Sequence, residues 1–153
     1  KPASYDDDFV HGLTKGEYRL AIKAPTTQLN AVSYTSSSKS KKVAYKKSKA
    51  KKIKLDGQTS NIYTTGEKTS RWYKISITST KKKRILNLGK NTVSGGYKFT
   101  IYKNGKKKAI KTIKVTENAN AKIAKMPKKK GTYYIRISKL TKKTNGTYEI
   151  GYY

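Results

Sequence analysis

The stretch TYYIRIS, residues 132–138, decides the fold of this chain. Tyr133, Ile135 and Ile137 occupy alternate positions in it, and an extended backbone points alternate side chains to the same face. β-Branched and aromatic residues such as these pack well on a pleated surface. The pattern therefore predicts a β-strand with one buried face, and it recurs in WYKISIT at residues 72–78 and in YKFTIY at residues 97–102.

Shorter runs continue this pattern along the C-terminal two thirds of the chain. We expect further strands at residues 83–88, 108–115, 121–126 and 147–152. Between the runs lie residue pairs that tolerate positive φ and predict turns, namely Gly95-Gly96, Asn104-Gly105 and Asn145-Gly146. Short strands separated by regular turn signals predict an all-β protein, a jelly-roll-like antiparallel β-sandwich.

Composition and an internal similarity divide the chain into three parts. Residues 55–153 form the predicted sandwich. Residues 35–54 are interpreted as a linker because nine of the sixteen residues from Lys39 to Lys54 are lysine, and like charges repel. The alternative is a strap that binds a polyanion. Residues 1–34 contain the segment KGEYRLAI (15–22), which aligns with the segment KGTYYIRI (130–137). We expect an additional N-terminal strand pair there, which is either the remnant of a preceding repeat or a chance match between two strand-forming segments.

The net charge of +29 is concentrated in one part of the chain. Residues 1–38 are neutral, so the whole excess lies in residues 39–153. Such a field attracts polyanions, among them nucleic acid, cell-wall polymer, acidic polysaccharide and an anionic membrane surface. Lysine outnumbers arginine by 33 to 4, which favours diffuse charge contact over bidentate reading of bases or phosphates. The alternative interpretation is that the lysines only keep the protein soluble.

Residues suited to catalysis or metal binding are scarce. The chain has no cysteine and one histidine, His11, so a nucleophile with a neighbouring base is not expected. We predict no catalytic residue and no cofactor. The one acidic cluster is a weak calcium candidate, formed by Asp6, Asp7 and Asp8. The same run is also typical of a solvated terminus or of a partner for the lysines.

The best candidate site follows from the alternation within the strands. If Tyr73 and Tyr133 point inward, their neighbours point outward. The predicted ligand-binding residues are Trp72, Lys74, Lys98, Tyr102, Tyr134 and Arg136. Outward aromatic rings beside cations stack on sugars, bases or proline-rich peptides while the charges bind acidic groups. The alternative is that these rings cover the ends of the sandwich or pack on residues 1–34.

Four motifs together resemble the bacterial pre-peptidase C-terminal domain. They are RWYKISI (71–77), YKFTIYKNGK (97–106), KGTYYIRI (130–137) and NGTYEI (145–150). The resemblance covers residues 55–153 and implies a jelly-roll-like sandwich in a secreted enzyme or surface protein, similar to the collagen-binding domains of clostridial collagenases. The family often has aspartate where Arg71 stands. The related collagen-binding domains use acidic residues near their N-terminal linker for calcium, whereas the lysine-rich linker here offers only Asp56 nearby, so a calcium site at that position is not expected.

These observations predict a non-catalytic extracellular binding or accessory module of a secreted or cell-surface bacterial protein, of Gram-positive type. We expect it to attach to polysaccharide, cell-wall polymer or matrix protein. No apolar run is long enough to span a bilayer. Two alternatives remain open, namely nucleic-acid binding without sequence preference and a structural spacer or pro-domain.

Overall fold

The computed structural model describes residues 42–153, and within them nine strands form two sheets. The predicted N-terminal strand pair, the acidic cluster Asp6, Asp7 and Asp8, and the first part of the lysine-rich segment lie outside the described residues. The elements are η1 (Lys47–Lys49), β1 (Lys51–Lys52), β2 (Gly57–Tyr63), β3 (Arg71–Ile77), β4 (Ile85–Ser94), β5 (Tyr97–Lys103), β6 (Lys111–Val115), β7 (Ala121–Lys125), β8 (Gly131–Lys139) and β9 (Asn145–Tyr152).

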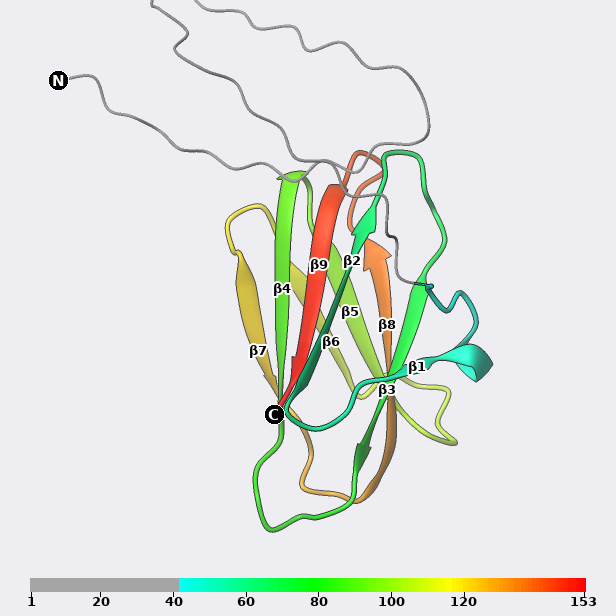
Figure 1. Ribbon diagram of the computed structural model, residues 1–153, viewed down its shortest axis with the longest axis vertical. Coiled ribbons are helices and arrows are strands. Elements are labelled where there is room, and N and C mark those ends of the chain that lie inside the picture. The colour runs from blue at the N-terminus through cyan, green and yellow to red at the C-terminus, as the bar shows by residue number, and fades with distance from the viewer. Residues whose placement is uncertain (1–41) are drawn as a thin grey trace, which may run out of the picture.

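The two sheets pack face to face as a sandwich (Figure 1). One has five strands in the order β1-β3-β8-β5-β6, and the other has four in the order β2-β9-β4-β7. All neighbours are antiparallel except β1 and β3, which pair in parallel. The predicted all-β class and antiparallel sandwich are confirmed.

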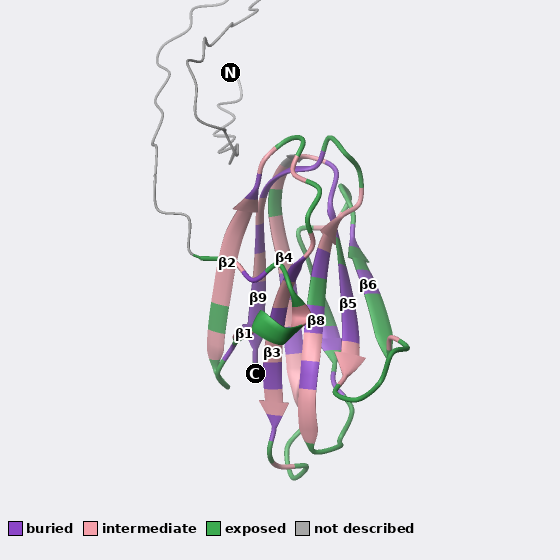
Figure 2. Ribbon diagram, turned by 90° about the vertical axis from the view of Figure 1, so that its right-hand side faces the viewer, coloured by how far each residue is buried: buried purple, intermediate pink, exposed green. Residues whose placement is uncertain are grey.

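Tyrosines fill much of the space between the sheets. The purple bands of Figure 2 mark the buried positions along the strands. The five largest fully buried side chains are Tyr63, Tyr97, Tyr133, Tyr148 and Tyr152. Each ring removes roughly 150–250 Å² from water, which explains how a chain with only 34% hydrophobic residues builds a core. Each hydroxyl has a hydrogen-bond partner, as a buried polar group requires.

We predict that the protein loses stability as the pH rises above about 10. Burial raises the pKa of Tyr63, Tyr97 and Tyr148 above the ordinary tyrosine value. In that range the unfolded chain releases phenolic protons that the folded chain retains, so the free energy of unfolding falls with increasing pH. A pH titration of tyrosinate absorbance and circular dichroism should show the buried phenols ionising together with loss of structure. Smooth ionisation of every tyrosine near pH 10 with unchanged dichroism would contradict the prediction.

Strand β2 has no counterpart among the predicted strands because, before Tyr63 at its end, its inward positions carry no large apolar side chain. Asn61 accepts a hydrogen bond from Arg71 Nη1 at 3.1 Å, so β2 lacks the apolar alternation that identifies its neighbours.

Two turn predictions also need correction. Lys106 N–H donates to Lys103 O at 3.1 Å, but pairing with β6 resumes only at Lys111, so the hairpin loop is longer than two residues. Asn145-Gly146 lies within β9 and is not a turn.

The C-terminal part of the predicted linker, residues 42–54, lies along the edge of β3. Trp72 N–H donates to Ala44 O at 2.8 Å, and Ile53 N–H donates to Lys74 O at 2.9 Å. Ala44, Ala50 and Ile53 are buried. Three small or apolar residues among the lysines therefore fix the segment to the sheet, while most of its lysines are exposed.

Candidate functional site

The six predicted ligand-binding residues lie on the outer face of the five-stranded sheet, and we call them the aromatic face. Alternation points Trp72 and Lys74 outward on β3 because Tyr73 and Ile75 are buried. The register then places Arg136 of β8 opposite Trp72. Tyr134 lies between Lys74 and Tyr102, and Lys98 follows on the same face of β5.

The aromatic rings of this face come into contact across three strands. The ring centroids of Trp72 and Tyr102 lie 5.7 Å apart at an interplanar angle of 37°. The Arg136 guanidinium lies 5.9 Å from the Trp72 ring, and its Nε donates to Ser70 Oγ at 2.9 Å. Both rings are only half-buried. The arrangement offers ring faces next to fixed positive charges, which suits a planar or ring-shaped ligand group that carries acid.

A cation from the lysine-rich segment completes the aromatic face. Helix η1 lies over the outer surface of β3 and β8 (Figure 2). Its Lys47 Nζ lies 4.9 Å from the Tyr134 centroid and 5.5 Å from the Tyr102 centroid. Sequence analysis missed Lys47, because nothing in a run of lysines distinguishes the one that returns to the sheet. The only signal was the set of apolar residues beside it.

Charge is distributed unevenly between the two sheets. The strands of each sheet total thirty residues, and ten in the five-stranded sheet are Lys or Arg. The four-stranded sheet has three, together with Glu149. The aromatic face therefore lies on the more positive side of the sandwich, where acidic groups are attracted.

Beneath the start of β3 lies a buried network centred on Arg71. Its Nη2 donates to both Glu67 carboxylate oxygens, at 2.8 and 2.9 Å, and its guanidinium stacks 3.9 Å from the Tyr63 ring centroid. Nη1 donates to the Tyr148 hydroxyl at 3.3 Å. Burial alone lowers the pKa of Arg71, but Tyr148 and Glu67 outweigh it and raise the pKa above the ordinary value. This network fixes the backbone from which Trp72 extends.

The acidic residues of the described part of the chain do not converge. Glu67 pairs with Arg71, and Glu117 accepts the Gly95 N–H at 2.7 Å. Glu149 lies on the four-stranded sheet and Asp56 on the loop before β2. Within residues 42–153, no group of three His, Cys, Asp or Glu side chains is placed to hold a metal ion. In the same range, no helix is long and apolar enough to cross a bilayer.

Comparison with known proteins identifies the fold. No protein-family model matches the sequence, and no curated protein matches it significantly. Among solved structures, the chain is similar to the pre-peptidase C-terminal domain of collagenase from Bacillus anthracis, with a TM-score of 0.56 and 19% identity over 69% of this chain and 95% of that one. The resemblance that the strand motifs predict is thus confirmed at the level of the fold.

A second solved structure is less similar. It is PliG of Aeromonas hydrophila, a periplasmic inhibitor of g-type lysozyme, with a TM-score of 0.45 and 11% identity over 69% of this chain and 98% of that one. A similarity of this size supports no argument about function.

Proposed function

We propose that the chain is a non-catalytic extracellular module of a bacterial secreted or surface protein, and that its aromatic face binds an acidic polysaccharide. The observation that carries the proposal is the contact of Trp72 with Tyr102 beside Arg136. Sugar rings stack on such faces, while the surrounding cations bind carboxylate or sulfate groups along the polymer. The fold shared with a collagenase domain supports an accessory role, although fold alone assigns no ligand.

The surroundings of the aromatic face favour an extended polymer over a small molecule. A small-molecule site is normally a concave pocket that encloses most of its ligand. The six residues instead lie on the outer surface of three neighbouring strands, where one chain can run across several rings. Among residues 42–153 the carboxylates are dispersed, and two of them are engaged, Glu67 by Arg71 and Glu117 by the Gly95 N–H, so we assign the aromatic face binding alone.

Trp72 is the single tryptophan of the chain and therefore reports on this face alone. We expect its fluorescence emission to change when polygalacturonate is added and to stay constant with neutral dextran. Tyr102→Ala should weaken binding about tenfold or more, since a stacked ring contributes on the order of 1–3 kcal/mol.

The matched control is Tyr153→Ala, which removes an exposed tyrosine at the end of the four-stranded sheet. Equal loss of affinity in both variants would refute the role of the aromatic face. Unchanged Trp72 emission with every acidic polysaccharide would refute the proposal as a whole. If the chain binds DNA with a steep salt dependence, and Tyr102→Ala leaves that affinity unchanged, the result would indicate nucleic-acid binding through charge alone.

A further inference from the structure

Three separate lysine triplets meet at one end of the sandwich. Strands β3 and β5 both run antiparallel to β8, so the ends of β3 and β5 and the start of β8 lie at the same end. Three of the loops attached there are residues 78–84, 104–110 and 126–130, and we call these three the lysine end (Figure 1). They carry no acidic residue and ten basic ones, namely Lys81, Lys82, Lys83, Arg84, Lys106, Lys107, Lys108, Lys128, Lys129 and Lys130. A fourth loop at the same end, before β2, carries Lys54 and Asp56, and its Asp56 N–H donates to Tyr152 O at 2.8 Å.

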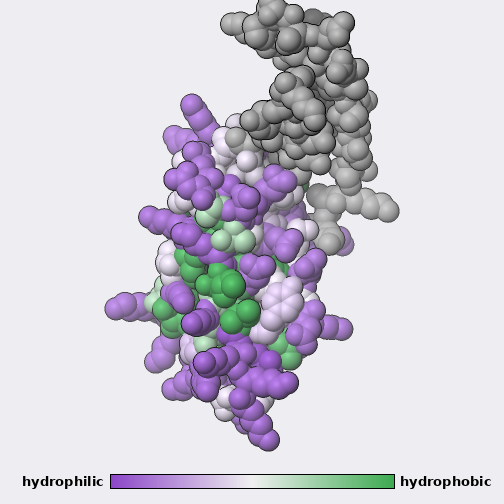
Figure 3. Space-filling view, turned by 90° about the vertical axis from the view of Figure 1, so that its left-hand side faces the viewer, coloured by the Kyte–Doolittle hydropathy of each residue, from purple (hydrophilic) through white to green (hydrophobic). Residues whose placement is uncertain are grey.

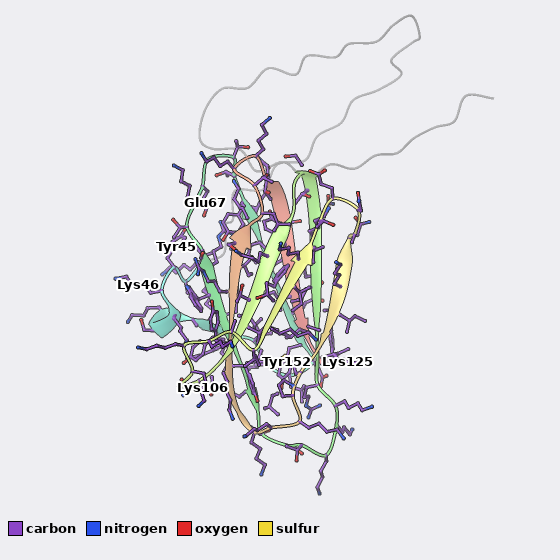
Figure 4. The ribbon with its side chains drawn as sticks, turned by 180° about the vertical axis from the view of Figure 1, so that it is seen from behind. Tyr45, Lys46, Glu67, Lys106, Lys125 and Tyr152 are labelled. Atoms are coloured by element: carbon purple, nitrogen blue, oxygen red, sulfur yellow. The ribbon has the colours of Figure 1, made fainter. Side chains whose placement is uncertain are left out.

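The opposite end of the molecule has a different charge. Its loops, residues 64–70, 95–96, 116–120 and 140–144, hold three lysines and two glutamates. In Figure 4, Glu67 lies toward that end, while Lys106 and Lys125 lie toward the other. If the lysines reflected only the overall composition, the loops at both ends would carry similar numbers of them. Lysines also protect exposed strand edges from pairing, but these triplets lie in loops.

Contacts between the loops hold the lysine end together. Met126 N–H donates to Arg84 O at 2.8 Å, which joins the loop of residues 126–130 to that of residues 78–84. Asn104 N–H donates to Thr132 O at 2.9 Å, and the Tyr133 hydroxyl donates to Lys129 O at 2.8 Å. The triplets therefore extend from ordered backbone, and their charges are presented together.

An apolar hollow lies between two of the triplets. It has a volume of about 230 Å³ and is lined by Ile101, Ile110, Lys111, Lys125, Met126 and Pro127. Ile110 is 43% exposed at its rim, and Ile123 of β7 is 65% exposed. Figure 3 shows an apolar patch framed by hydrophilic side chains on the side of the molecule where β7 lies. Exposed apolar groups beside lysines are typical of a surface that meets both head groups and acyl chains.

We propose that the lysine end docks on a bilayer that contains anionic lipid. The triplets bind acidic head groups, and Ile110 with its hollow contacts the acyl boundary. A soluble polyanion would use the triplets but would leave the isoleucines in water, so the apolar hollow favours the membrane. This site is separate from the aromatic face, and neither proposal depends on the other.

The test measures sedimentation of the whole 153-residue chain with phosphatidylcholine vesicles, with and without phosphatidylglycerol. Each lysine near an anionic surface contributes about 1 kcal/mol, so loss of one triplet should lower the partition coefficient on the order of a hundredfold. The variants are K106Q/K107Q/K108Q and K128Q/K129Q/K130Q. The matched control, K68Q/K142Q/K143Q, removes the same charge from the opposite end and should bind like the parent.

Two further variants separate the possible interpretations. Ile110→Asn should weaken vesicle binding and leave retention on immobilised polyphosphate unchanged, whereas Trp72→Ala should leave vesicle binding unchanged. Thermal unfolding of each variant shows whether the fold is kept. The proposal is overturned if the control triplet loses as much binding as the others, if vesicles without anionic lipid bind equally, or if Ile110→Asn has no effect. The last result would assign the lysine end to a soluble polyanion.

Discussion

Glu67→Gln is expected to lower the free energy of unfolding by about 3 kcal/mol, because it leaves the Arg71 guanidinium buried without its counter-charge. The Arg71 side chain is 5% exposed, whereas that of Glu67 is 22% exposed. Most of the cost therefore comes from the unpaired arginine. Urea denaturation followed by the fluorescence of Trp72, the residue after Arg71, measures the loss directly.

A control and a second substitution make this prediction specific. Glu149→Gln is the same change at a side chain that forms no ion pair within residues 42–153, and it should alter stability by less than about 0.5 kcal/mol. Arg71→Met combined with Glu67→Gln should recover part of the loss, since the buried charge is then gone. If the double variant is less stable than Glu67→Gln, the network stabilises through its contacts with tyrosine and not through charge pairing.

Gly146→Ala should destabilise the protein by roughly 3 kcal/mol or more, through a steric clash added to backbone strain. Gly146 has φ +131°, and a Cβ atom there would lie 2.3 Å from Asn91 O and 2.6 Å from the Thr92 Cα. Both are backbone atoms of β4, so the paired strands would have to separate. Gly146 O also accepts the Tyr97 hydroxyl at 2.6 Å, which couples the displacement to the core.

Gly105→Ala provides the comparison for this prediction. Gly105 also has positive φ, +72°, but a Cβ atom there would meet nothing within 4 Å. It should cost about 1–2 kcal/mol, the strain of a left-handed residue alone. Thermal unfolding of the two variants separates strain from clash, and equal losses would show that the β4–β9 contact adds nothing.

Alternation of apolar and polar residues in the sequence predicted most of the strands of the fold. It works for β3, β5 and β8 because most of their inward residues are aromatic or β-branched. It fails for β2, where Asn61 faces inward to serve Arg71. Arg71 is buried because it bonds to Tyr148, which lies more than seventy residues away in the sequence. The residues next to such a polar side chain in the sequence do not indicate that it is buried.

The sequence predicted which residues form the candidate site, but not how they are arranged relative to one another. Strand alternation identified Trp72, Tyr102 and Tyr134 as outward, while the order of strands in the sheet, which brings them together, depends on long-range pairing. The lysine end was missed for the same reason. Each KKK triplet looks like a solvated loop by itself, and only the topology places three of them side by side.

The separation of the two ends has a consequence for how a partner meets this protein in solution. Strand β4 alone spans roughly 30 Å at about 3.3 Å per residue, whereas the Debye length at physiological ionic strength is about 8 Å. The two ends are therefore electrostatically independent, and an approaching partner responds to the local charge and not to the total of +29. At low ionic strength the unequal ends form a dipole that turns the lysine end toward a negative surface before contact. Raising the salt concentration removes this long-range orientation before it removes the local charge contacts.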